Sequence, residues 1–100
     1  MIRRTVRTSQ AFFDQLDEQL GTSRGPKGEP SATDFLVVEL PAIVEAFATR
    51  FDELPEAVEG VPHARMAIGT GALVSAFAVY GLLMADDAVE LIGVEIDLSP

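Results

Sequence analysis

The stretch that decides the fold is LVSAFAVYGLLM at residues 73–84, which is followed by the polar turn ADDA at 85–88 and by VELIGVEIDL at 89–98. The first of these runs is apolar almost without interruption. In the last run the even-numbered positions from Ile92 onward are apolar, whereas the odd-numbered ones include Glu95. This alternation has the period of two that is typical of a half-buried strand. Two such runs joined by a short Asp-Asp turn predict a β-hairpin.

A third strand is expected immediately upstream, at Arg65–Ile68, where the glycine-rich turn Gly69-Thr70-Gly71 follows it. Strands that are joined by short turns pair in antiparallel fashion. The last third of the chain therefore predicts a three-stranded antiparallel meander whose middle strand is the most apolar.

The beginning of the chain predicts a strand and then an amphipathic helix. IRRTVRT at residues 2–8 places apolar and polar side chains on opposite sides, which suits a short strand at or near a sheet edge. Ser9 is a favourable N-cap, and Gly21 stands where a helix end accepts a left-handed residue. Between them, apolar residues recur every four positions on one helix face: Phe12, Leu16 and Leu20.

A second helical region begins at Ser31, which forms a capping-box pattern with Asp34. Pro41 interrupts it, because proline within a helix removes a hydrogen bond and clashes with the preceding turn. We expect either a kink or a new helix with Pro41 at its first position. The run FLVV at 35–38 fits a strand as well as a helix. Pro55 ends the region, whose apolar face after Pro41 is formed by Ile43, Phe47, Phe51 and Leu54.

The composition predicts one small domain, residues 1–100. A chain of 100 residues buries enough surface for a single core. It has no cysteine, which excludes a disulfide framework and thiolate metal sites. The N-terminal MIRRTVRTSQ carries positive charge without a following apolar stretch, so we expect no signal peptide and a cytoplasmic location.

The charge is distributed unevenly along the chain, whose net charge is −9. Residues 1–27 hold five of the seven basic groups, and the remainder holds only Arg50 and Arg65 against thirteen acids. Phosphate backbones repel so acidic a chain, and we expect no DNA binding by the chain alone. This charge distribution has two interpretations. The first is a solvated acidic surface, and the alternative is a basic N-terminal patch that binds an acidic partner or RNA.

The segment GTSRGPKGEP at 21–30 is a basic loop that lacks the ending of a phosphate-binding P-loop.

Met66–Ala85 also fits a membrane span. It is twenty residues without a formal charge, flanked by Arg65 and Asp86, and about twenty apolar residues cross a bilayer. Against this interpretation stand the glycines near its start and the alternating segment that follows it. Moreover, the upstream helices need a sheet to cover. We therefore expect no membrane association.

Taken in order, the expected elements are strand, helix, helix, strand, strand and strand. In this order, and in the segments IRRTVRTSQAFFDQL at 2–16 and AVYGLLMADDAVELIGVEIDL at 78–98, the chain resembles the RelE/ParE superfamily of toxins from bacterial type II toxin–antitoxin systems. The resemblance implies an α+β domain of order β-α-α-β-β-β, with two helices packed on one face of a four-stranded antiparallel sheet.

The resemblance also implies one of two activities. RelE-like members are ribosome-dependent mRNA endonucleases, whereas ParE-like members poison gyrase by protein contact. For cleavage by 2′-hydroxyl attack, the candidate catalytic residues are Arg65 as phosphate clamp, Tyr80 as orienting or acidic hydroxyl and His63 as base. An RNA-cutting relative offers basic or aromatic groups on its final strand. Here that strand carries acids, which weighs against a ribonuclease: Glu90, Glu95 and Asp97.

We therefore favour a toxin-like component that binds a bacterial protein target or the ribosome and is neutralised by a cognate antitoxin laid along its sheet or a helical groove. This hypothesis predicts that Phe12, Phe47 or nearby apolar groups are partly exposed in the free protein. The alternatives are a ribonuclease of the same fold and a small structural or assembly subunit of phage or membrane origin. We expect no cofactor and no metal site, because the adjacent acids Asp86 and Asp87 lack a third ligand nearby. The candidate partner-binding residues are Phe12, Phe47, Arg24 and Lys27.

Overall fold

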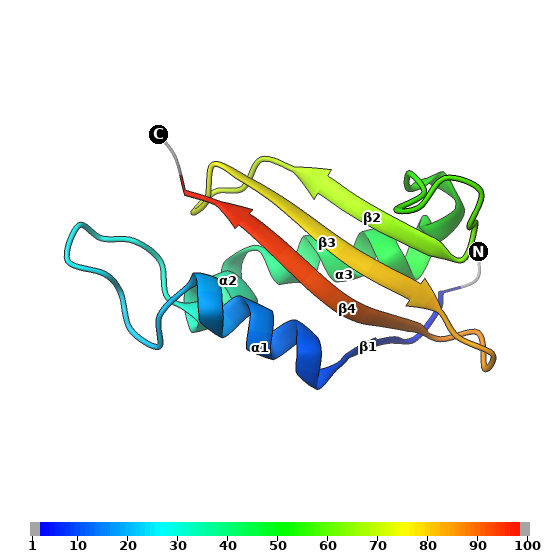
Figure 1. Ribbon diagram of the computed structural model, residues 1–100, viewed down its shortest axis with the longest axis horizontal. Coiled ribbons are helices and arrows are strands. Elements are labelled where there is room, and N and C mark those ends of the chain that lie inside the picture. The colour runs from blue at the N-terminus through cyan, green and yellow to red at the C-terminus, as the bar shows by residue number, and fades with distance from the viewer. Residues whose placement is uncertain (1–2, 99–100) are drawn as a thin grey trace.

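The computed structural model describes residues 3–98 as an α+β fold with one four-stranded sheet (Figure 1). The sheet has the order β1-β4-β3-β2. In Figure 1 one face of the sheet is turned to the viewer, α3 lies behind it, and α1 runs along β4. The elements in chain order are β1 (Val6–Thr8), α1 (Gln10–Gln19), α2 (Ala32–Val38), α3 (Leu40–Thr49), a 3₁₀ helix (Phe51–Glu53), β2 (Ala64–Gly69), β3 (Ala76–Leu83) and β4 (Val89–Asp97).

The predicted antiparallel meander is confirmed, but the prediction of an entirely antiparallel sheet is wrong. β2 pairs with β3 and β3 with β4 in antiparallel register, whereas β1 pairs parallel to β4 through Val6↔Val89 and Thr8↔Leu91. The expected first strand at 2–8 is also shorter, beginning at Val6, and its residue 2 lies outside the described residues. The sheet is therefore mixed.

The direction of β1 follows from what the chain does next. Ser9 N–H donates to Leu91 C=O at 3.0 Å, and α1 then continues beside the second half of β4 in the same direction. Two glutamines of α1 bond the outer edge of β4 there. Gln15 donates to Ile92 C=O at 3.4 Å and accepts from Val94 N–H at 3.0 Å. Gln19 donates to Val94 C=O and accepts from Ile96 N–H, both at 2.7 Å.

This pairing works because the two repeats match. Residues four apart on a helix are separated by about 6 Å along its axis, and residues two apart on a strand by about 6.6 Å. Each glutamine amide offers one donor and one acceptor to the strand, as a peptide group would. The helix therefore replaces the strand that β1 is too short to provide.

A β-bulge in β4 changes which side chains face the core. Tyr80 pairs with Gly93 and Gly81 with Leu91, so Ile92 is an extra residue on β4. As a result, odd-numbered Leu91 and even-numbered Val94 are both buried. The predicted alternation from Ile92 onward is wrong at Ile92, because the bulge interrupts it there, and it holds again from Val94.

The starts of the helices follow the sequence signals, but two of their ends do not. The predicted helix up to Pro55 is wrong, because α3 ends at Thr49 and a separate 3₁₀ helix follows. Ser9 caps α1 by accepting from Phe12 N–H, and both bonds of the Ser31–Asp34 capping box are present. A new helix, α3, begins at Leu40 with Pro41 in its first turn, and FLVV belongs to α2 rather than to a strand. The prediction that Gly21 adopts a left-handed conformation is wrong. Leu20 ends α1 in an extended conformation, which keeps its side chain in the core.

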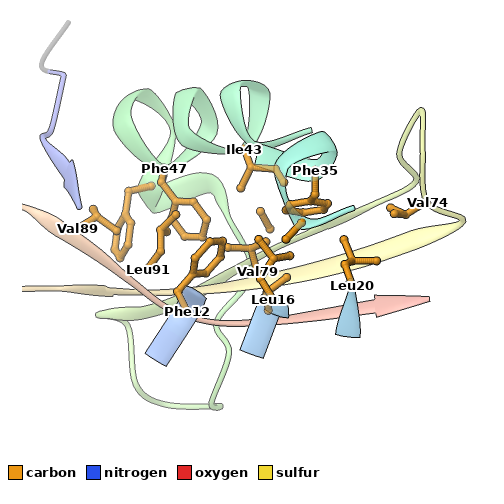
Figure 2. Close-up of a cluster of buried hydrophobic side chains, with 14 residues drawn as sticks. Phe12, Leu16, Leu20, Phe35, Ile43, Phe47, Val74, Val79, Val89 and Leu91 are labelled. Carbon is orange, nitrogen blue, oxygen red and sulfur yellow. The ribbon is translucent and has the colours of Figure 1, made fainter. Parts of the chain in front are cut away.

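The membrane-spanning interpretation of residues 66–85 is wrong, because that stretch is divided among β2, a loop and β3. Within residues 3–98 no helix is long and apolar enough to cross a bilayer. The apolar run instead supplies the central strand of the sheet. Figure 2 shows side chains of α1, α2 and α3 converging with those of the strands in one core. Its fully buried members include Phe12, Leu16, Phe35, Phe47, Val79, Val89 and Leu91.

A charge at the contact between α1 and β4, which we call the helix–strand seam, tests how much the glutamine hydrogen bonds stabilise the fold. Gln19→Glu keeps the acceptor for Ile96 N–H but sets a carboxylate oxygen against the Val94 carbonyl. We expect the free energy of unfolding to fall by about 1–2 kcal/mol at neutral pH, measured by urea denaturation. The loss should shrink below about pH 4, where the introduced carboxyl protonates and donates again. Glu18→Gln, on the exposed side of the same helix, is the control. Equal stability of the two variants would show that the Gln19 hydrogen bonds do not stabilise the fold.

Candidate functional site

The predicted catalytic residues Arg65 and Tyr80 lie on opposite faces of the sheet. Tyr80 pairs with Met66, so the two share a face, and the neighbouring Arg65 points the other way. The Arg65 guanidinium accordingly lies 5.7 Å from the centre of the Phe51 ring, on the helix side. Arg65 and Tyr80 therefore cannot act on one phosphate from these positions.

Arg65 is engaged by the backbone of the connector that leads into β2. Its guanidinium donates to the carbonyls of Pro62 at 2.6 Å, Leu54 at 2.7 Å and Asp52 at 3.2 Å. Three carbonyls, one from the 3₁₀ helix and two from the segment between it and β2, are thereby fixed around one cation. This geometry gives Arg65 a structural role.

Tyr80 and His63 show no arrangement for acid–base chemistry. The Tyr80 hydroxyl donates to Glu95 at 3.1 Å. Burial and the carboxylate of Glu95 raise the pKa of Tyr80 above its ordinary value of 10.0, which makes it a weaker acid. His63 is exposed in the connector just before β2.

The predicted exposure of Phe12 and Phe47 is wrong, because both side chains are 0% exposed. They come from α1 and α3 and meet in the core (Figure 2). Gly81 is what admits Phe47, since a Cβ at that position would lie 2.7 Å from its ring. As partner-binding residues they would need the core to open.

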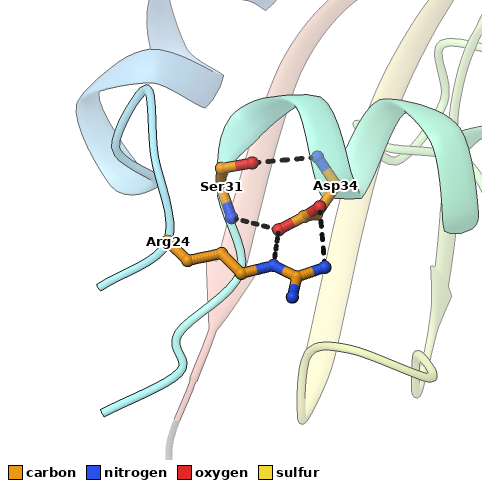
Figure 3. Close-up of polar contacts among 3 residues, drawn as sticks. All are labelled: Arg24, Ser31 and Asp34. Carbon is orange, nitrogen blue, oxygen red and sulfur yellow. Dashed lines mark hydrogen bonds and ion pairs between the residues drawn. The ribbon is translucent and has the colours of Figure 1, made fainter. Parts of the chain in front are cut away.

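The predicted partner-binding residue Arg24 is paired within the chain. It donates to both carboxylate oxygens of Asp34, at 3.0 and 3.4 Å, and Asp34 also accepts from Ser31 N–H at 2.9 Å (Figure 3). Together, Arg24 and the backbone of Ser31 lower the pKa of Asp34 to about 2. The side chain of Lys27, in the same loop, has no partner among residues 3–98.

The basic N-terminal patch is neutralised in the same way. Arg3 pairs with Glu45, Arg4 with Asp87 and Arg7 with Asp86. The last two ion pairs tie the start of the chain to the β3–β4 turn, where Asp87 adopts a positive φ of 68°. These arginines are therefore occupied by the fold.

The face of the sheet toward the viewer in Figure 1 is covered by no helix of the described chain. We call it the open face. Alternation along the strands places two kinds of residue on it. β2 and β3 contribute an apolar half, and β4 contributes an acidic half. The apolar half consists of Met66, Ile68, Ala78, Tyr80 and Leu82, and the acidic half consists of Glu90, Glu95 and Asp97.

A cavity of about 550 Å³ lies on the other side of β2, between that strand and α3. We call it the α3–β2 groove. Arg50 lines one end, and Glu39 lines the other. The carboxylate of Glu39 accepts from Ala72 N–H at 3.0 Å and Leu73 N–H at 3.1 Å, which fixes the loop between β2 and β3. The remaining lining is mainly apolar: Val38, Ala42, Ile43, Ala46, Leu54, Pro55, Ala67, Phe77 and the loop residues Thr70, Gly71 and Ala72, with Ile68 bordering the groove at the strand edge.

The sequence-based predictions do not include the open face or the α3–β2 groove, although the sequence contains a signal for both. The uncharged run from Met66 to Ala85 holds both the apolar half of the open face and the strand beside the groove. In the sequence alone, the length of this run also fits a bilayer span, which obscures an unprotected strand edge. Within residues 3–98 no three His, Asp or Glu side chains gather closely enough to hold a metal ion.

Comparison with protein-family models, with curated proteins and with solved structures finds no match for this chain. What the chain does is therefore inferred from its own surfaces.

Removing the Arg65 side chain should destabilise the fold more than removing the Tyr80 hydroxyl. Arg65→Ala leaves three backbone carbonyls without this donor, and we expect a loss of about 2 kcal/mol in the free energy of unfolding. Tyr80→Phe removes one exposed hydrogen bond and should cost less than about 1 kcal/mol. Urea denaturation of both variants measures this difference, and an Arg65→Ala variant as stable as the parent would refute the structural role.

The ion pair at α2 should make stability depend on pH in the acidic range. The pKa of Asp34 in the folded chain is about 2, below its ordinary 3.8, so its stabilisation is complete above about pH 4 and is lost as the pH falls through 2. Asp34→Asn should therefore be less stable than the parent at neutral pH, and the difference should diminish toward about pH 2. Denaturation at several pH values measures it. Asp17→Asn, on an exposed position of α1, is the control, and a difference that does not change with pH would contradict the assignment.

Proposed function

We propose that this chain is the toxin-like component of a type II toxin–antitoxin pair, which acts in the cytoplasm by binding a protein target and is neutralised by a cognate antitoxin. The observation that carries the proposal is the open face, on which an apolar half lies directly beside an acidic half. A contiguous apolar area next to charges of one sign is typical of a surface that binds another protein.

The charge on this face indicates the kind of partner. Glu95 and Asp97 border the apolar residues of β3, because they pair with Ala78 and Ala76. The chain as a whole carries a net charge of −9, which attracts basic partners over a distance. A protein segment with an apolar stripe flanked by lysine or arginine fits the face in both respects.

The same observations disfavour the ribonuclease alternative. Arg65 and Tyr80 lie on opposite faces, and each is held by partners within the chain. The face that would meet RNA carries acids on β4. A phosphate backbone is repelled there rather than clamped.

Tightly induced expression of the untagged chain in bacteria tests the proposal. We expect growth arrest with intact messages, and with broken DNA where the target is gyrase. Leu82→Glu places a charge in the apolar half of the open face and should restore growth, because burying an unpaired carboxylate against a partner is costly. Val37→Glu, at an exposed position of α2 (68% exposed), is the matched control and should arrest growth as the parent does.

Three outcomes would contradict the proposal. Normal growth with abundant parent protein would favour an assembly subunit instead. Cleaved messages would favour the ribonuclease. Arrest by Leu82→Glu at the parent's strength, with circular dichroism showing that the variant is folded, would exclude the open face as the binding surface.

A further inference from the structure

The outer edge of β2 is protected along its first half only. Met66 N–H donates to Pro55 C=O at 3.0 Å, and Ala57 N–H donates to Ala64 C=O at 2.8 Å. The segment 55–57 therefore already lies on this edge like a short antiparallel strand. Alternation puts the C=O of Met66 and both backbone groups of Ile68 on the same outward side. Among residues 3–98 no partner bonds these three groups.

Nothing in the sequence blocks this open half. Protected strand edges carry a charge, a proline or a bulge that prevents another strand from pairing. Here the edge residues are Met66, Ala67 and Ile68, and the register with β3 runs through them without a shift. Ile68 is 60% exposed. The opposite edge of the sheet, by contrast, is covered by β1 and by the glutamines of α1.

The α3–β2 groove lies beside this open edge. A strand added to β2 would direct alternate side chains toward α3, where Ala42 and Ala46 line the groove with small side chains. From Glu39 to Arg50 the groove follows α3 for about 16 Å, at about 1.5 Å per residue. An extended peptide of about five residues has the same length.

Arg50 adds a charge preference. It lines the groove, and its side chain forms no ion pair or hydrogen bond with any residue between 3 and 98. The other arginines are all bound within the chain. A guanidinium left free beside an apolar groove fits a carboxylate on the occupant.

We propose that an extended segment of another protein pairs with β2 beyond Met66 as an added strand, with alternate apolar side chains in the α3–β2 groove and a carboxylate on Arg50. This inference adds a second contact to the proposed function and rests on it for the partner being a protein. The preference for basic residues belongs to the open face, whereas the preference for a carboxylate is local to Arg50 in the groove. A second copy of the chain fits less well, because it brings a further net charge of −9 to an acidic molecule.

The probe is a displayed library of random linear peptides of about seven residues, slightly longer than the groove, selected on the purified chain. We expect enriched peptides to alternate apolar residues and to carry Asp or Glu near one end. Ile68→Pro removes the outward N–H without removing a β2–β3 bond, because that N–H points away from β3. It should weaken binding of the selected peptide at least about tenfold. Ile68→Thr keeps the N–H and should stay within about threefold.

A second variant decides the result if Ile68→Pro does not fold. Arg50→Glu should weaken the acidic peptides about tenfold and restore binding to a peptide whose acid is changed to lysine. The inference is overturned if no peptide is enriched, or if the selected peptide binds the folded Ile68→Pro variant and Arg50→Glu as it binds the parent. Because peptide binding is measured on the purified chain, its failure is distinct from a failure to arrest growth.

Discussion

The hydrogen bonds between the glutamines of α1 and the edge of β4 are the constraint on which the arrangement of this protein depends. β1 covers β4 only as far as Leu91, and the backbone groups beyond it need other partners. Gln15 and Gln19 supply them from a helix that runs beside the strand. Only Ser9 joins β1 to α1, so a chain that covers the first half of β4 with β1 and the second half with α1 must run in the direction of β4, which makes β1 parallel to that strand.

The same placement of α1 determines the core. With the glutamines turned to the strand edge, the helix directs Phe12 and Leu16 beneath the sheet, where they meet Phe47 of α3. The bulge at Ile92 lies where β1 ends and the glutamine contacts begin. It lets β4 keep buried side chains on both sides of that junction, although the strand changes its edge partner there.

The periodicity of the sequence was enough to predict elements whose stability is local. The meander, the Ser9 cap and the Ser31–Asp34 capping box depend on neighbours within a few residues, and all are confirmed. The direction of β1 was not predictable in this way, because a strand pattern is the same in parallel and antiparallel pairs. For the site, the residue types of Arg65 and Tyr80 suggested catalytic roles. The pleat of the sheet places their side chains on opposite faces, which residue type alone does not indicate. The edge contacts of Gln15 and Gln19 have no signal in the sequence, since glutamine is usually exposed.

The two edges of the sheet show why the open half of β2 is a better candidate for recognition than the residues singled out by type. An unpaired strand edge invites association with other chains, and proteins normally suppress it. This protein suppresses it along β4 with polar side chains placed at matching intervals, and along the start of β2 with the segment 55–57. Beyond the Met66 N–H the protection stops, beside a groove lined at one end by Arg50, whose side chain has no partner among residues 3–98. An edge closed elsewhere with such regularity and left open beside an apolar groove is best explained by a partner that completes it.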